Sequence, residues 1–121
     1  MNIQESGENY LETILILQTK KPEVRSIDIV NELGYSKPSI SRAVSILKKN
    51  GYINIDDLGN ITLTDSGNTI ASRMYERHQT LTEYLIVLGV TPETAAQDAC
   101  RMEHIISQET FDKIRAHAQR R

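Results

Sequence analysis

The sequence predicts a mainly α-helical fold with one small β-hairpin, in which a winged helix-turn-helix is followed by a helical extension. Three observations predict this fold class. Two helical segments joined by a short turn at Gly34 are followed at once by two short β-branched runs, the order of elements in a winged helix. Three more segments with helical periodicity come after them. The chain has 121 residues, 39% hydrophobic and 25% charged, enough for one compact domain and an appendage.

The ends of the expected helices are indicated by residues that favour helix termini. Ser, Thr and Asp side chains accept hydrogen bonds from the first N–H groups of a helix, while Pro and Gly mark its first turn and its end. We expect helix starts at Ser26, Ser36, Thr64 or Asp65, Thr91 and Ser107. The expected elements are helices at residues 6–19, 26–33, 36–50, 64–88 and 91–106, strands at 51–55 and 60–64, and a last helix after residue 107.

Apolar patterns support these elements. In the first helix, Tyr10, Ile14 and Leu17 share one face. The runs GYINI and NITLT alternate or are β-branched, and DDLG between them predicts a turn. The stripe of the long helix consists of Ile70, Met74, Leu81, Leu85 and Leu88. The one position missing from that stripe is His78.

Composition restricts the location and the chemistry of the protein. No apolar run approaches the roughly 18 residues that span a bilayer, and the N-terminal stretch is acidic where a signal peptide would be basic. We therefore expect a cytoplasmic protein with no membrane partner. The single cysteine, Cys100, cannot form an internal disulfide, so it is a buried thiol, a metal ligand or a reactive group. Residues 33–55 hold four basic and no acidic residues, which suits either a nucleic-acid-binding segment or an ordinary solvated helix.

The motif CRMEH holds a cluster of potential metal ligands. Glu103 and His104 lie three and four residues after Cys100, so on a helix the three side chains lie close together. Cys100 and Glu103 also follow the spacing of a packed stripe that begins at Ala96. A carboxylate on a packed stripe costs several kcal/mol unless something positive meets it. A divalent cation would meet that need.

Three other residues extend this potential site. His78 is expected as a fourth donor because a helical hairpin would bring its stripe against the next helix, and Asn9 and Glu12 could add oxygen ligands. Imidazole, carboxylate and thiol together suit Fe(II), Mn(II), Co(II), Ni(II) or Zn(II) better than Mg or Ca. Each residue also has a simpler interpretation. A lone cysteine is commonly a small core residue, a single histidine commonly bonds a backbone carbonyl, and a surface glutamate is commonly solvated.

Five motifs, in order along the chain, resemble those of the iron- and manganese-dependent repressors of the diphtheria toxin repressor type: ENYLETI, KPSISRAV, YERHQTL, LGV and DACRMEH. The resemblance covers nearly the whole chain. It implies a homodimer in which a winged-helix DNA-binding domain, residues 1–72, precedes a helical metal-binding and dimerisation domain, residues 73–121. It also implies that bound metal favours binding to a palindromic operator and that metal homeostasis genes are controlled.

The resemblance implies a ligand set by position. The set is Asn9, Glu12, His78, Cys100, Glu103 and His104. Cys100 matches the iron branch of the family and Glu12 the manganese branch. The family has Asp or Met in place of Asn9, so this ligand would be a neutral amide oxygen or a backbone carbonyl. Thr82 stands where the iron branch has a Glu of an ancillary site, so we expect no such second site, and we expect the SH3-like third domain of that branch to be absent.

DNA recognition is expected from the first turns of the third helix, the end that enters the major groove in helix-turn-helix proteins. The candidate DNA contacts are Ser36, Lys37, Ser39, Arg42, Lys48 and Lys49. We expect Ser39 and Arg42 to read base edges and the three lysines to contact phosphates. The wing tip, Asp56 and Asp57, is acidic and is assigned no contact.

Three functions compete on these observations. A metal-dependent transcriptional repressor with Fe(II) or Mn(II) as cofactor explains both the DNA-reading half and the ligand set. A metal-independent winged-helix regulator, whose helical extension only dimerises, is the alternative. A small metalloenzyme built on His78, Glu103 and His104 would need a further base, an oxyanion donor or a substrate pocket, and the sequence indicates none. We therefore expect a repressor, not an enzyme, with no small organic ligand.

Overall fold

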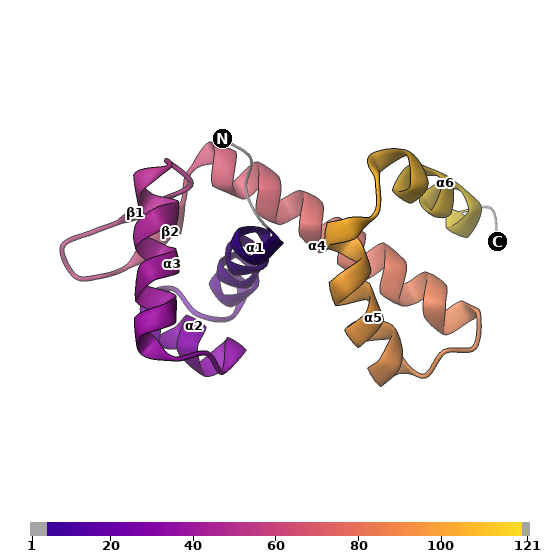
Figure 1. The fold of residues 1–121 in the computed structure, drawn as a ribbon, viewed down its shortest axis with the longest axis horizontal. Coiled ribbons are helices and arrows are strands. Elements are labelled where there is room, and N and C mark those ends of the chain that lie inside the picture. Colours follow the sequence, from indigo (N-terminus) through magenta and orange to yellow (C-terminus); the bar gives the residue numbers. More distant parts are fainter. Residues whose placement is uncertain (1–4, 120–121) are drawn as a thin grey trace. The chain divides into compact units, whose positions relative to one another are not determined.

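The computed structural model describes residues 5–119, which form a mainly α-helical fold with one two-stranded antiparallel hairpin (Figure 1). The elements of this part of the chain are α1 (Glu5–Lys20), α2 (Ser26–Leu33), α3 (Lys37–Lys49), β1 (Ile53–Ile55), β2 (Ile61–Leu63), α4 (Asp65–Val87), α5 (Pro92–Ile105) and α6 (Gln108–Gln119). The predicted fold class and the order of its elements are confirmed. Among the helices of residues 5–119, none combines the length and the apolar character needed to cross a membrane.

The chain forms two compact units, with the boundary between Ser72 and Arg73. The first unit contains α1, α2, α3, the hairpin and the first part of α4. The second contains the rest of α4 with α5 and α6. The long helix α4 therefore supplies residues to both units.

The core of the first unit collects apolar residues from α1, α2, α3, both strands and the first part of α4. Its fully buried side chains include Leu11, Ile14, Ile29, Ile40, Ile53 and Ile61. In the hairpin, Ile53 pairs with Leu63 and Ile55 with Ile61, so the two buried strand residues lie on one face. The N–H of Ile61 donates a 2.7 Å hydrogen bond to the carbonyl of Val24, which ties the α1–α2 connection to the wing.

Helix caps confirm most of the expected starts. Ser36 accepts a hydrogen bond from the N–H of Ser39, Thr64 accepts one from Gly67, and Ser107 accepts one from Thr110. The predicted cap at Ser26 is wrong, because α2 begins at that residue. The N-cap is Arg25, whose backbone N–H donates a 2.8 Å bond to the carboxylate of Asp28.

The second unit packs around Leu81, Ala99 and Phe111. The buried face of α5 is shifted by one residue from part of the predicted stripe. The buried residues of α5 are Ala95, Ala99 and Glu103, and Cys100 is exposed, so the expectation that Cys100 lies on the packed stripe is wrong. The small alanine side chains allow α5 to pack closely, and the buried face therefore centres on them.

The α4 stripe also differs from its prediction. The buried position between Met74 and Leu81 is Arg77, while His78 beside it is half-buried. Leu88 lies beyond the end of α4 and is 63% exposed. A charged residue takes the buried position because its guanidinium finds carbonyl acceptors there, a circumstance that hydrophobic spacing does not reveal.

Gly67, in the first turn of α4, is required by a close backbone approach. A Cβ atom at this position would lie 2.0 Å from the carbonyl oxygen of Tyr52, just before β1. The Tyr52 carbonyl accepts a hydrogen bond from the N–H of Thr64, and the Thr64 hydroxyl donates to the carbonyl of Gly51. The hairpin and the start of α4 are thereby joined through backbone atoms that cannot easily move apart.

Replacing Gly67 with alanine should destabilise the protein. We expect the free energy of unfolding to fall by about 1–3 kcal/mol or more, because the new methyl group overlaps a backbone oxygen. Urea denaturation followed by circular dichroism measures this change. Asn68→Ala, at an exposed position next along the helix, should alter the same quantity by less than about 0.5 kcal/mol. A Gly67→Ala variant as stable as the parent protein would contradict the close approach.

Candidate metal centre and DNA-reading helix

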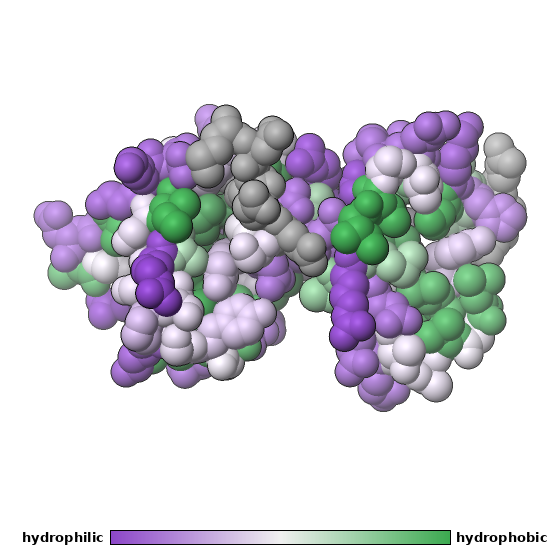
Figure 2. All heavy atoms as spheres, in the orientation of Figure 1, coloured by the Kyte–Doolittle hydropathy of each residue, from purple (hydrophilic) through white to green (hydrophobic). Residues whose placement is uncertain are grey.

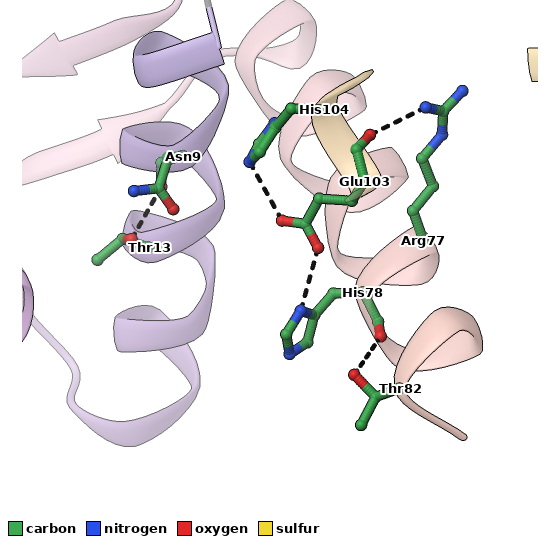
Figure 3. A network of polar contacts seen from close by, with 7 residues as sticks. All are labelled: Asn9, Thr13, Arg77, His78, Thr82, Glu103 and His104. Atoms are coloured by element: carbon green, nitrogen blue, oxygen red, sulfur yellow. Dashed lines mark hydrogen bonds and ion pairs between the residues drawn. The ribbon is translucent and has the colours of Figure 1, made fainter. Parts of the chain in front are cut away.

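The carboxylate of Glu103 lies between two imidazole rings (Figure 3). Its Oε2 is 3.0 Å from Nδ1 of His78 on α4, and its Oε1 is 3.3 Å from Nε2 of His104, the next residue on α5. The Glu103 side chain is 0% exposed. A buried carboxylate is costly unless polar or positive groups meet it, so the two rings stabilise it here. Thr82 holds the His78 backbone through a 2.7 Å hydrogen bond from its hydroxyl to the His78 carbonyl.

Each of the two nitrogen–oxygen pairs, formed with different oxygens of the Glu103 carboxylate, is spaced like two ligands of one metal ion. Two ligand atoms each about 2.1 Å from a first-row metal lie roughly 3.0 Å apart at a right angle and roughly 3.4 Å apart in a tetrahedron. The two nitrogen–oxygen distances, 3.0 and 3.3 Å, fall within this range. Imidazole nitrogen and carboxylate oxygen are donors that Mn(II), Fe(II) and Zn(II) all accept. The residues present therefore fit a divalent transition metal.

Cys100 lies at the surface beside His78. It lines an open groove on the second unit together with His78, Ala96, Gln97 and Arg101. His78 is thus shared between the groove and the buried contact with Glu103. Of the predicted donors on α4 and α5, direct contacts bring together His78, Glu103 and His104, whereas Cys100 adjoins this cluster from the exposed side.

The two remaining predicted ligands, Asn9 and Glu12, lie on α1 in the first unit. They are three residues apart and therefore lie on neighbouring positions of one helix face. The backbone carbonyl of Asn9 accepts a 2.8 Å hydrogen bond from the hydroxyl of Thr13 (Figure 3). The Asn9 carbonyl therefore already accepts a side-chain hydrogen bond.

Arg77 is a residue of this region that the sequence patterns did not single out. Its Nη1 donates to the backbone carbonyls of Glu103 at 2.9 Å and Ile106 at 3.0 Å, and its Nη2 donates to Gln108 at 2.9 Å. The residue is 6% exposed, and its guanidinium lies 5.3 Å from the centre of the Phe111 ring. The available signal was a cation three residues after Met74, on a stripe position that an apolar residue would ordinarily occupy.

The predicted DNA contacts lie along α3 and just before it. The four cationic residues among them are all exposed: Lys37, Arg42, Lys48 and Lys49. The Oγ of Ser36 accepts a 3.3 Å hydrogen bond from the Ser39 N–H and donates a 2.9 Å bond to the Ser39 Oγ. The Ser36 hydroxyl is therefore engaged at the helix start, while Arg42, about one turn after Ser39, is exposed.

Asp56 shapes the turn of the wing. Its Oδ1 accepts hydrogen bonds from the backbone N–H groups of Leu58 and Asn60, both at 2.9 Å, and its Oδ2 accepts one from the Asn60 side chain at 3.1 Å. These bonds, first of all the one from the Asn60 backbone, hold the pKa of the Asp56 carboxyl below its ordinary value. Asn60 in turn accepts a 3.3 Å bond from Nε of Arg25, which links the wing to the start of α2.

Both halves of the chain match known protein families. Residues 2–57 match the family described as iron dependent repressor, N-terminal DNA binding domain. Residues 64–120 match the family described as iron dependent repressor, metal binding and dimerisation domain.

Individual proteins are similar over most of the chain. This chain is 38% identical over 112 residues to the transcriptional regulator MntR of Salmonella typhimurium. The aligned region covers 93% of this chain and 71% of that protein. This chain is 31% identical over 109 residues to the HTH-type transcriptional regulator MntR of Lysinibacillus sphaericus, covering 90% and 78% of the two chains. A solved manganese-dependent transcriptional repressor in complex with manganese is 27% identical, with a TM-score of 0.86 over 93% of this chain. The chain spans about half of that solved protein, 52% of its length.

Replacing Ser36 with alanine should weaken the start of α3. We expect the free energy of unfolding to fall by about 1 kcal/mol, because the Ser39 N–H loses its acceptor. Urea denaturation provides the measurement. Ser41→Ala, at an exposed position of the same helix, is the control and should change stability by less than about 0.5 kcal/mol. Equal losses in the two variants would show that Ser36 has no special role as a cap.

Proposed function

Because the chain belongs to the iron-dependent repressor family of metal-dependent transcriptional regulators, we propose that it represses metal homeostasis genes by binding operator DNA when Mn(II) or Fe(II) occupies its metal site. The observation that carries this proposal is the fully buried Glu103 carboxylate between His78 and His104. The family consists of regulators, so we assign no catalytic activity. The protein acts in the cytoplasm, where its DNA is accessible.

We assign six residues as metal ligands, and the observations that support them differ from residue to residue. They are His78, Glu103 and His104, with Cys100, Glu12 and Asn9 as further ligands. The first three have donor atoms in contact, and Cys100 shares a groove with His78. Asn9 and Glu12 are included on the family resemblance. A divalent cation, when bound, supplies the positive charge that the buried Glu103 carboxylate favours, and Co(II), Ni(II) or Zn(II) can substitute for Mn(II) or Fe(II).

The distribution of this ligand set gives metal binding a route to DNA affinity. Asn9 and Glu12 belong to the first unit, which carries α3, and the other ligands belong to the second. A set drawn from both units is complete in only some conformations of the chain. A metal that binds those conformations more tightly shifts the population toward them. Such couplings typically amount to about 1–3 kcal/mol, or roughly 5- to 150-fold in affinity.

A homodimer would present two copies of α3 to a palindromic operator, whose half-sites lie about 34 Å or a multiple of that distance apart. The second unit supports dimerisation through exposed apolar residues at the end of α4. Ile86 is 41%, Val87 49% and Leu88 63% exposed, and Figure 2 shows hydrophobic residues gathered over this end of the helix. Adjacent exposed apolar side chains are typical of surfaces that a partner subunit covers.

Metal should strengthen DNA binding by the full chain. We expect Mn(II) to raise affinity at least about tenfold for an operator selected from random DNA in the presence of that metal. Fluorescence anisotropy titrations measure the gain, with Fe(II) and Zn(II) as parallel tests. Glu103→Gln keeps the side-chain size but removes the buried charge, so it should lose the gain.

The matched control is Glu93→Gln, which removes an exposed carboxylate from the first turn of the same helix. This variant should keep the full metal response. DNA binding that is equal with and without metal would favour the metal-independent regulator. A complete lack of DNA binding would contradict the repressor.

Arg42 and Lys48 should affect DNA binding in different ways. Arg42→Ala should weaken binding to the selected operator by about 1–3 kcal/mol and to unrelated DNA much less, because it removes a base contact. Lys48→Ala should weaken both alike and reduce the slope of log affinity against log salt by about 1. Anisotropy titrations at several salt concentrations make the comparison. An Arg42→Ala variant that weakens both DNAs equally would reassign Arg42 to the phosphates.

A further inference from the structure

We propose that Arg77 is a positioning residue for the metal centre, holding the last turn of α5 so that the Glu103 carboxylate stays between His78 and His104. This inference rests on the proposed function, since it takes Glu103 as a metal ligand. Its basis is that Arg77 contacts the backbone of the same residue whose side chain meets both imidazoles. Figure 3 shows the Glu103 carbonyl directed toward Arg77 and its carboxylate directed away, toward the two rings.

The contacted carbonyls belong to a helix end that needs external donors. The last carbonyls of an α-helix have no N–H partner within the helix. α5 ends at Ile105, so the Glu103 carbonyl lies in its last turn, and Ile106 already has extended backbone angles. One nitrogen of Arg77 serves both the Glu103 and the Ile106 carbonyl. Arg77 therefore caps the turn that carries Glu103 and His104.

The position of Arg77 is itself fixed by α6. Its second terminal nitrogen donates to the side chain of Gln108, in the first turn of α6, and its guanidinium lies over the Phe111 ring. Burial of the group, at 6% exposure, leaves few other orientations. The carbonyl end of α5, the start of α6 and α4 are thus connected through one side chain.

Arginine is suited to this role because its planar guanidinium presents several donors in a fixed arrangement. A lysine ammonium at the same place keeps the charge but offers a single nitrogen on a flexible stem. It cannot serve the two carbonyls and Gln108 together with the geometry of the fork. Arg77→Lys therefore removes the positioning while it retains the positive charge.

Arg115 offers a matched control. Its guanidinium lies 5.2 Å from the centre of the same Phe111 ring, but its ion pairs are with Glu76 and Asp112 and its side chain is 37% exposed. Within residues 5–119, the hydrogen bonds of Arg115 go to the Glu76 and Asp112 side chains and not to the α5 backbone. Arg115→Lys hence perturbs the packing on Phe111 without reaching Glu103.

The test compares Mn(II) affinity of the full chain with that of Arg77→Lys and Arg115→Lys by calorimetry, well below the unfolding midpoint of each protein. We expect Arg77→Lys to weaken Mn(II) binding about 10- to 100-fold, the range for residues that orient metal ligands. Arg115→Lys should change it less than about twofold. Wild-type affinity in a folded Arg77→Lys variant would overturn the proposal, because a merely structural role would lower only the unfolding midpoint.

A second measurement needs no metal. In metal-free protein, the ring ¹⁵N chemical shifts of His78 and His104 at fixed pH report their contacts with Glu103. They should move in Arg77→Lys and stay constant in Arg115→Lys; constant shifts in both variants would overturn the proposal. If the parent protein binds no metal, the proposed function fails while these shifts still decide the role of Arg77.

A milder variant covers the case in which Arg77→Lys does not fold. Gln108→Ala removes one acceptor of Arg77 and leaves both backbone carbonyls in place. Mn(II) affinity should fall several-fold, and the His78 ring shifts should move in the same direction as in Arg77→Lys. A folded Gln108→Ala variant with wild-type affinity and unchanged shifts would overturn the proposal.

Discussion

The buried carboxylate of Glu103 sets the main constraint on the second unit. A carboxylate with no exposure to water is stable only if polar or positive groups surround it. His78 and His104 provide those groups within 3.3 Å. The alanines at positions 95 and 99 contribute indirectly, since their small side chains allow α5 to pack closely enough for these contacts to form. In the proposed function, a divalent cation adds further positive charge beside this carboxylate.

The long helix α4 serves a different purpose in each unit. At its start, Gly67 permits the Tyr52 carbonyl to approach the helix, so the hairpin and α4 are joined backbone to backbone. Further along, Arg77 and His78 contact the end of α5 through their side chains. The two halves of one helix are therefore constrained by different chemistry, steric fit in the first and polar contacts in the second.

The elements of the fold were predictable because local signals mark most of their ends. Ser36, Thr64 and Ser107 all cap the helices that their positions indicated. The start of α2 at Ser26 is predicted correctly, but its cap is not, because the capping carboxylate belongs to Asp28, three residues after the N-cap Arg25. Residues that can cap a helix are visible in the sequence. Which of two neighbouring candidates does so depends on the geometry of the folded chain.

The candidate site was predictable in part. The sequence singles out Glu103 and His104 by their spacing from Cys100, and His78 because it interrupts an apolar stripe; in the structure the Glu103 carboxylate contacts both imidazoles. Cys100 was assigned to the wrong face, since a shift of one residue in a helix rotates a side chain by about 100° and spacing alone cannot fix that rotation. Arg77 was missed because its burial depends on carbonyls 26 and 29 residues away in the chain. Such acceptors exist only in the folded state.

The two acidic residues of the wing have different roles. Asp56 closes the turn with its own carboxylate, so its side chain is reserved for the loop, while Asp57 next to it is exposed. A substitution at Asp56 would therefore remove the bonds that close the turn, whereas one at Asp57 would change mainly the charge of the wing surface.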